Sequence, residues 1–173
     1  NRAAEHLGSE IGDRVVHPND HVNYGQSSND VIPTAMHVAA LEAVRKDLIP
    51  GLETLADALD EKATAFDGVV KTGRTHLQDA TPVRLGQEYG GYRTQVEKGI
   101  ERCESVTPQL AELALGGTAT GTGLNTHPEF PERAAAYIGE ETGIDFREAD
   151  DHFEAQAAHD AMSEAHGALR TVA

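Results

Sequence analysis

Two runs of apolar residues repeat at helical spacing over long stretches, and this feature constrains the fold more than any other. The first run consists of Leu41, Val44, Leu48, Leu52, Leu55 and Leu59. The second consists of Tyr89, Tyr92, Val96, Ile100, Cys103, Val106, Leu110 and Leu113. Steps of three and four residues put each run on one face of an α-helix. Because helices of roughly 25–30 residues far exceed the mean of about 11, we expect an all-α fold, an elongated bundle of long, kinked helices.

Capping and breaking residues set the expected limits of the first long helix. Ser28, Asn29 or Asp30 can cap its start. Pro50 lies inside it and should kink it, because proline lacks the N–H that the helix needs there. We expect this helix to end near Thr64.

The other helices are placed by similar signals. The second long helix should begin at Thr81-Pro82, bend near Pro108 and end at Gly116-Gly117. A shorter helix should span residues 131–142, and a final one should run from Asp151 to the chain end. Strand signals are confined to two short segments, 69–72 and 144–146.

Composition and charge narrow the class of protein. A chain of 173 residues has about the size of one domain and can bury a real core. Its 29 acidic residues against 14 basic ones give a formal net charge of −15. This charge repels nucleic acid and anionic membranes at long range, so neither is expected as a partner. Only four of the basic residues are Lys, and we expect such an acidic, lysine-poor surface in a protein that works in high salt.

Cysteine count and hydropathy point to the compartment. The single Cys103 excludes an intramolecular disulfide and a Cys-based zinc site. No apolar run reaches about 18 residues, and the chain does not start with a secretory signal. We therefore expect a soluble protein of a reducing, cytoplasmic compartment. Helical patterns run up to both termini, so we also expect a chain that is incomplete at both ends.

Three segments interrupt the helical pattern and are rich in hydrogen-bond donors: residues 14–30, 72–82 and 115–125. In the first, Ser27, Ser28 and Asn29 stand before a helix N-terminus, which suits a carboxylate or phosphate, although they could equally be simple caps. In the second, His76 can exchange a proton near neutral pH, but a surface histidine would look the same. The third is Gly-rich without a P-loop ending, and we interpret it as a flexible connector that brings backbone close to a ligand.

A metal site is not predicted. His17 and His21 have the spacing of two metal ligands on one helix face. However, Pro18 and Asn19 make a helix improbable there, and the sequence offers no obvious third ligand.

In their order and spacing, the three segments resemble the class II fumarate hydratases of the fumarase/aspartase superfamily. The matching motifs are His17-Pro18-Asn19-Asp20-His21-Val22-Asn23, Gln26-Ser27-Ser28-Asn29-Asp30, Pro33-Thr34-Ala35-Met36-His37, Gly73-Arg74-Thr75-His76-Leu77-Gln78-Asp79-Ala80-Thr81-Pro82, Leu85-Gly86-Gln87-Glu88, Ala114-Leu115-Gly116-Gly117-Thr118-Ala119 and Gly121-Thr122-Gly123-Leu124-Asn125-Thr126-His127-Pro128-Glu129. The resemblance extends from residue 2 to residue 169. The chain departs from the family at His21, where Asp is common, and in the acidic run 148–152; neither is a site position of the family.

The resemblance implies reversible hydration of fumarate to L-malate, a step of the tricarboxylic acid cycle, without metal or organic cofactor. It implies that residues 1–27 are the end of an N-terminal domain with its substrate and second-site loop. Residues 28–173 would then be part of a central helical bundle. The family forms homotetramers in which several subunits share each active site, with fumarate and L-malate as ligands.

The resemblance also implies individual roles. His76 would be the acid/base residue, and Ser27, Ser28, Asn29 and Thr75 would bind the substrate carboxylates. A second dicarboxylate site would comprise Arg14, His17, Asn19 and Asp20. In the family, a serine on a Gly-Ser-Ser loop removes the carbon-bound proton. This sequence does not contain that loop, so we expect little activity from the isolated chain.

Two alternatives remain at this stage. Aspartate ammonia-lyases of the same superfamily are similar in the first segment, but they usually carry Gln in place of His76 and lack the motif 33–37. The second alternative is a helical fragment that only takes part in assembly and has no catalytic activity.

Overall fold

The computed structural model describes residues 1–173 and confirms a helical architecture with only two small, two-stranded sheets. The chain forms two compact units, and each is described by itself. Unit 1 comprises residues 1–37 and 112–159, and unit 2 comprises residues 38–111 and 160–173. The domain boundary expected between residues 27 and 28 concerns the longer family fold, and it stays a prediction.

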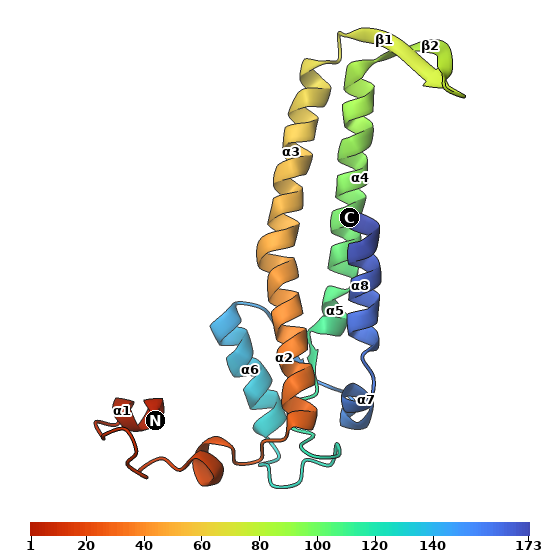
Figure 1. Cartoon of the computed structure of the whole chain (residues 1–173). Coiled ribbons are helices and arrows are strands. Elements are labelled where there is room, and N and C mark those ends of the chain that lie inside the picture. The colour runs from red at the N-terminus through yellow and green to blue at the C-terminus, as the bar shows by residue number, and fades with distance from the viewer. The chain divides into compact units, whose positions relative to one another are not determined.

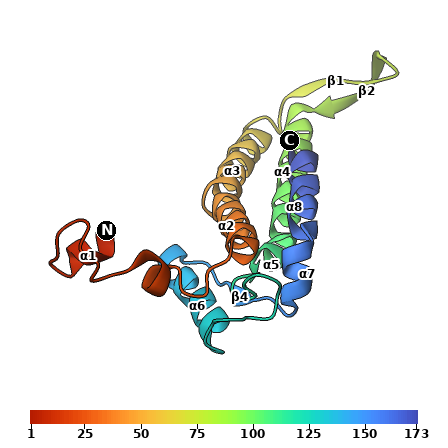
Figure 2. The ribbon, with the colours of Figure 1, turned by 60° about the horizontal axis from the view of Figure 1, so that its bottom comes forward.

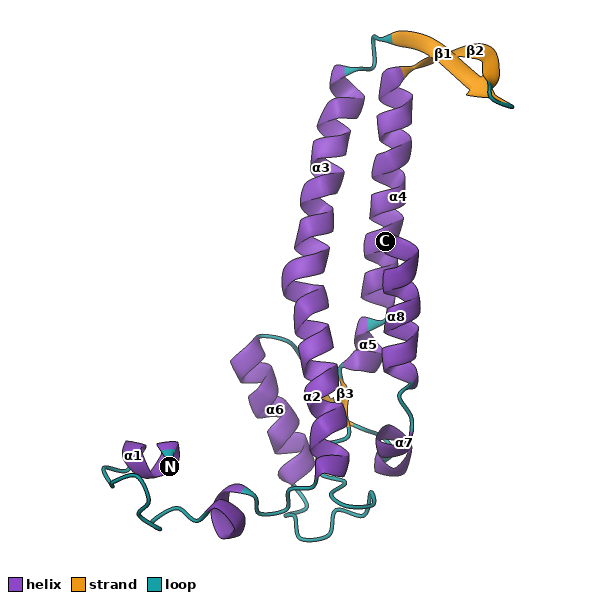
Figure 3. Ribbon diagram, viewed as in Figure 1, coloured by secondary structure: helices purple, strands orange, loops and turns teal.

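Unit 2 is dominated by two long antiparallel helices, with a β-hairpin between them at one end (Figures 1 and 3). Its elements are the end of α2 (Ser28–Ala43), the π-helical turn η2 (Val44–Leu48), α3 (Ile49–Ala65), β1 (Val70–Thr75), β2 (Gln78–Arg84), α4 (Leu85–Ser105), α5 (Thr107–Leu110) and α8 (Asp160–Val172). Helix α3 packs along α4, and α8 packs against α4 as well (Figure 2).

The core of unit 2 joins the two apolar runs recognised in the sequence. Val44, Ile49 and Cys103 are buried together. The partly buried side chains around them are Leu48, Leu52, Ile100 and Val172. Members of both runs meet in this cluster, so the prediction that each run is a buried helix face is confirmed here.

The first long helix ends close to its predicted limit near Thr64 but begins slightly before its predicted start. Helical structure is continuous from Ser28 to Ala65 through α2, η2 and α3. A π-helical turn, Val44–Leu48, lies just before Pro50, at which a kink was expected. Proline lacks a backbone N–H, and its ring clashes with the preceding turn, so regular α-helical bonding is disfavoured at this place.

The second long helix was predicted too long at both ends. Residues 78–84 form strand β2, in which Pro82 pairs with Thr72, and α4 begins only at Leu85. A two-stranded ribbon tolerates proline because each strand has one unpaired edge. At the other end a bend was expected near Pro108, and the helix is instead divided at Val106 into α4 and α5. Helix α5 stops at Leu110, and the chain then enters strand β3.

Unit 1 combines short helices with long irregular segments. Its elements are α1 (Arg2–His6), the π-helical turn η1 (Pro18–Val22), the start of α2, β3 (Glu112–Leu113), α6 (Phe130–Thr142), β4 (Arg147–Glu148) and α7 (His152–Ala157). Strands β3 and β4 are parallel, and the Arg147 guanidinium lies 2.6 Å from the Glu112 carboxylate across them.

The two C-terminal helix predictions had different outcomes. Helix α6 ends as predicted, with Gly143 in the left-handed conformation at φ 71°. The last predicted helix does start after Asp151, whose carboxylate accepts the N–H groups of Phe153 and Glu154. It is divided into α7 and α8, because Ala158 is extended, and no glycine or proline marks that break in the sequence.

Candidate functional site

The first turn of α2 is capped by Ser27. Its carbonyl accepts the N–H of Val31 at 3.1 Å, and its hydroxyl oxygen accepts the N–H of Asn29 at 3.2 Å. The cap therefore lies one residue before the three predicted candidates. Ser28 and Asn29 are exposed and Ser27 is half-buried, so this turn offers neutral donors and unpaired backbone N–H groups, which suit a carboxylate.

The Gly-rich segment 115–125 is bonded to this turn by two consecutive side chains. The Asn29 amide nitrogen donates to the carbonyl of Ala119 at 2.7 Å. The Asp30 side chain is fully buried, and its Oδ2 accepts the N–H of Gly116 at 3.0 Å and of Thr118 at 2.9 Å. These bonds correct the expectation of a flexible connector, because they fix the segment against the helix.

This function of Asp30 was missed by sequence reasoning, which considered the residue only as a cap. An acidic residue in the first turn of a helix is common for electrostatic reasons alone. Its partners lie 86 and 88 residues further along the chain. No local pattern could therefore have revealed them.

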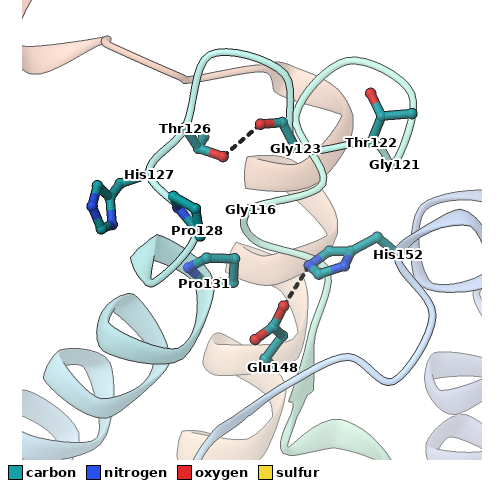
Figure 4. A pocket seen from close by; sticks show the side chains of 10 residues that line it. All are labelled: Gly116, Gly121, Thr122, Gly123, Thr126, His127, Pro128, Pro131, Glu148 and His152. Atoms are coloured by element: carbon teal, nitrogen blue, oxygen red, sulfur yellow. Dashed lines mark hydrogen bonds and ion pairs between the residues drawn. The ribbon is translucent and has the colours of Figure 1, made fainter.

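A pocket of about 330 Å³ adjoins the Gly-rich segment (Figure 4). It is lined by Gly116, Gly121, Thr122, Gly123, Thr126, His127, Pro128, Pro131, Glu148 and His152. Nε2 of His152 lies 3.2 Å from the carbonyl oxygen of Leu115 and 3.7 Å from the Glu148 carboxylate. The imidazoles of His127 and His152 lie on opposite sides of this pocket. None of the predicted site residues lines it.

His76 occupies the tight turn between β1 and β2. The flanking pair Thr75 and Gln78 closes the ladder, which leaves His76 and Leu77 as a two-residue loop. Both have positive φ, 51° and 60°, as a hairpin turn of the mirror-image type requires, although glycine and asparagine are the usual residues there. Both side chains are exposed, as is Thr75. The hairpin thus presents the predicted acid/base residue to solvent on a tightly bent backbone.

The four residues predicted to form a second dicarboxylate site are close in sequence at or near η1. Arg14, Asn19 and Asp20 are exposed, and His17 is half-buried. Nδ1 of His17 accepts the Asp20 N–H at 3.2 Å and lies 3.1 Å from the Asp20 carboxylate. The backbone N–H of His17 donates to Nδ1 of His21 at 2.9 Å. Residues 18–22 form a π-helical turn, although a helix was not expected next to Pro18 and Asn19.

The predicted site residues are divided between the two units. Ser27, Ser28, Asn29 and the four residues near η1 belong to unit 1, whereas Thr75 and His76 belong to unit 2. No group of three or more His, Cys, Asp or Glu side chains is arranged to hold a metal ion. No helix is both long and apolar enough to cross a membrane.

The whole chain, residues 1–173, matches the family model described as lyase. The chain belongs to this lyase family. It is 84% identical over 163 residues to the class II fumarate hydratase of Halobacterium salinarum, covering 94% of this chain and 35% of that protein. It is 61% identical to the class II fumarate hydratase of Nitrosomonas europaea, covering 100% of this chain and 38% of that one.

Solved structures of lyases agree with the fold. The class II fumarase of Schistosoma mansoni has a TM-score of 0.89 at 40% identity, covering 98% of this chain and 39% of that chain. A fumarate lyase:delta crystallin of Brucella melitensis has a TM-score of 0.91 at 38% identity, and the match covers 99% of this chain and 37% of that chain. This lyase chain therefore spans somewhat more than a third of the length of its relatives.

Proposed function

We propose that the protein to which this chain belongs catalyses the reversible hydration of fumarate to L-malate in the tricarboxylic acid cycle. The observation that carries the proposal is the 84% identity to a relative named class II fumarate hydratase. The chemistry of the residues agrees with it. Removing a proton beside a carboxylate builds an enolate-like dianion, and preplaced neutral donors stabilise such developing charge.

Each candidate residue has a role in this proposal. Ser27, Ser28 and Asn29 bind substrate carboxylates at the start of α2, and Thr75 adds a further hydroxyl. His76 moves the proton of the water or hydroxyl: in dehydration it protonates the departing hydroxyl, which leaves as water while the carbon-bound proton goes to a separate base. The exposed position of His76 on the hairpin supports this role, because a proton-transfer residue has to reach the substrate.

Arg14, His17, Asn19 and Asp20 form the proposed second dicarboxylate site. The exposed guanidinium of Arg14 and the exposed amide of Asn19 suit an anion. Asp20 cannot itself attract a dicarboxylate. Its backbone N–H donates to Nδ1 of His17, which supports a role in orienting that ring.

We also propose a cytoplasmic homotetramer with active sites shared between subunits. The support is that Leu55 and Tyr92, which belong to the two apolar runs, are 47% and 52% exposed in this chain. Large apolar side chains on long helices suit burial against other subunits. Light scattering of the full-length protein should give four subunit masses, and a monomer at micromolar concentration would contradict the proposal.

The catalytic proposal is tested with His76→Asn in the full-length protein. Asparagine tolerates the left-handed backbone at this position, so the hairpin should remain intact. We expect turnover of L-malate to fall by about 10²–10⁴-fold, the usual contribution of a positioned acid or base. Leu77→Asn is the matched control, because it places asparagine at the neighbouring left-handed position of the same turn and should leave turnover near the wild-type value.

Two outcomes would contradict the proposal. Near-wild-type turnover by the His76→Asn variant would remove His76 from the mechanism. Release of fumarate from L-aspartate but not from L-malate by the wild-type protein would instead identify an ammonia-lyase.

A further inference from the structure

The strongest feature outside the proposed site is the buried carboxylate of Asp30. It is the third residue of α2, it follows Asn29 directly, and its side chain is fully buried. A buried carboxylate is costly unless it is well hydrogen-bonded. Oδ2 accepts two backbone N–H groups, from Gly116 and Thr118, whereas Oδ1 is buried without a partner. All of its observed bonding is therefore directed at the Gly-rich segment.

The segment needs this support because its backbone is unusual. Thr118 has φ 58°, a left-handed conformation that a β-branched residue rarely adopts. Its N–H is held by Asp30, and its carbonyl accepts the side-chain amide of Gln156 at 2.7 Å. The peptide groups on both sides of Thr118 are thus bonded to side chains.

The next residue connects the segment to the proposed substrate site. The carbonyl of Ala119 accepts the amide of Asn29 at 2.7 Å. Asn29 and Asp30 therefore bond to almost adjacent peptide groups of one short backbone stretch. If that stretch moves, the acceptor that orients the Asn29 side chain moves with it.

We infer that Asp30 is a positioning residue: it holds residues 116–119 in place, and through the Ala119 carbonyl it sets the orientation of Asn29 toward a substrate carboxylate. This inference rests on the proposed function. Asp30 has no contact with substrate in this role. Its negative charge is not required, since only its capacity to accept two N–H groups is used.

The test compares Asp30→Ala with Asp30→Asn in the full-length protein. Alanine removes both hydrogen bonds, whereas the asparagine oxygen can still accept them. We expect Asp30→Ala to raise the KM for L-malate about tenfold, because small displacements of a binding group are costly. The value of kcat should fall less than KM rises, because the substrate carboxylate is already charged in the ground state and only the charge added in the transition state affects kcat. In Asp30→Asn, the KM for L-malate should stay close to the wild-type value.

A double-mutant cycle with Asn29→Ala tests the route of the effect. If Asp30 acts through Asn29, then Asp30→Ala should have little further effect on KM once Asn29 is replaced. The matched control is Thr34→Val. Thr34 is buried one turn further along α2 and its hydroxyl has no partner, so this variant should leave KM unchanged.

Hydrogen exchange supplies a readout that does not depend on turnover. Amides of residues 115–125 should exchange faster in Asp30→Ala but not in Asp30→Asn or Thr34→Val. The inference is overturned if Asp30→Ala keeps a wild-type KM, if the Asn29 and Asp30 effects multiply independently, or if Asp30→Asn is as impaired as alanine. A wild-type protein that turns over no L-malate would overturn the proposed function instead, and unchanged exchange in Asp30→Ala would then overturn the positioning role as well.

Discussion

Unit 1 and unit 2 are stabilised by different kinds of contact. In unit 2, Val44, Ile49 and Cys103 pack between long regular helices, and the backbone satisfies its own hydrogen bonds. In unit 1, a buried carboxylate at Asp30 and a side-chain amide at Asn29 satisfy the peptide groups of an irregular segment. Irregular backbone needs such specific partners, and this is where most of the proposed ligand-binding donors are found.

The two units also differ in charge. Unit 1 has 15 acidic and 4 basic residues, a net charge of −11, and unit 2 has 14 acidic and 10 basic residues, a net charge of −4. The donors proposed to bind a dicarboxylate at the start of α2 thus belong to the more acidic unit. The net charge of unit 1 gives an anion no long-range attraction. These donors therefore contribute affinity through short-range hydrogen bonds from N–H and hydroxyl groups.

The largest effect is expected from Gly116→Ala in unit 1. Gly116 has φ 104°, and an added Cβ would lie 2.3 Å from Cγ of Pro131. Both the backbone conformation and the space exclude a side chain. We expect the free energy of unfolding to fall by about 2–5 kcal/mol, the combined cost of left-handed backbone and overpacking. Denaturant titration followed by circular dichroism measures it.

The matched control is Gly143→Ala. Gly143 also has positive φ, 71°, but an added Cβ meets nothing within 4 Å. In Gly143→Ala the free energy of unfolding should fall only by the cost of the left-handed backbone, about 1–2 kcal/mol. Equal losses in the two variants would show that the packing of Pro131 on Gly116 is unimportant.

In unit 2 the corresponding substitution is Gly86→Ala. Here the backbone is ordinary, but an added Cβ would lie 2.3 Å from the carbonyl oxygen of Ala63, so α3 and α4 would have to separate at that end. We expect a loss of about 1–3 kcal/mol from overpacking. Gly90→Ala, in the same helix with nothing within 4 Å, should instead stabilise by about 0.5–1 kcal/mol. A loss in both variants would contradict the packing explanation.

This contrast explains how much could be predicted from sequence. Apolar periodicity over 41–59 and 89–113 is a local signal, and it predicted the long helices of unit 2. It could not reveal that residues 78–84 pair with 70–75, because Thr81-Pro82 carries the same local signal as a helix start. The strand pairing that overrides it depends on the turn at His76 and Leu77.

The candidate site was predictable to a different degree. Ser27, Asn29 and His76 were recognised because their chemistry stands out in segments that break the helical pattern. The hydrogen bonds that Asp30 accepts from Gly116 and Thr118 were not recognised, because a long stretch of chain separates Asp30 from both residues. Each of the three residues, taken alone, also has an ordinary explanation. Residues that bind can be found by their type, whereas residues that position others require the structure.

A smaller effect is expected from Cys103 in the core of unit 2. Burial raises the pKa of its thiol above the ordinary value of about 8.5. The folded chain therefore favours the protonated thiol. Its contribution to stability is complete below about pH 8.5 and is lost as the pH rises through the raised pKa. Between pH 7 and 10, the free energy of unfolding in urea should fall more for the wild-type protein than for Cys103→Ala. Parallel curves for the two proteins would exclude this contribution.

The smallest effect concerns the charge difference between the units. Mutual repulsion of carboxylates is screened by salt, with a Debye length of about 3 Å at 1 M and 30 Å at 0.01 M. Lowering the salt should therefore loosen unit 1, at −11, more than unit 2, at −4. We expect amides of the segment 115–125 to exchange about threefold faster at low salt, while those of α3 and α4 change less. Equal acceleration in both units would mean that net charge does not distinguish them. No acceleration of the segment would mean that the side-chain bonds of Asp30 and Asn29 hold it without screening.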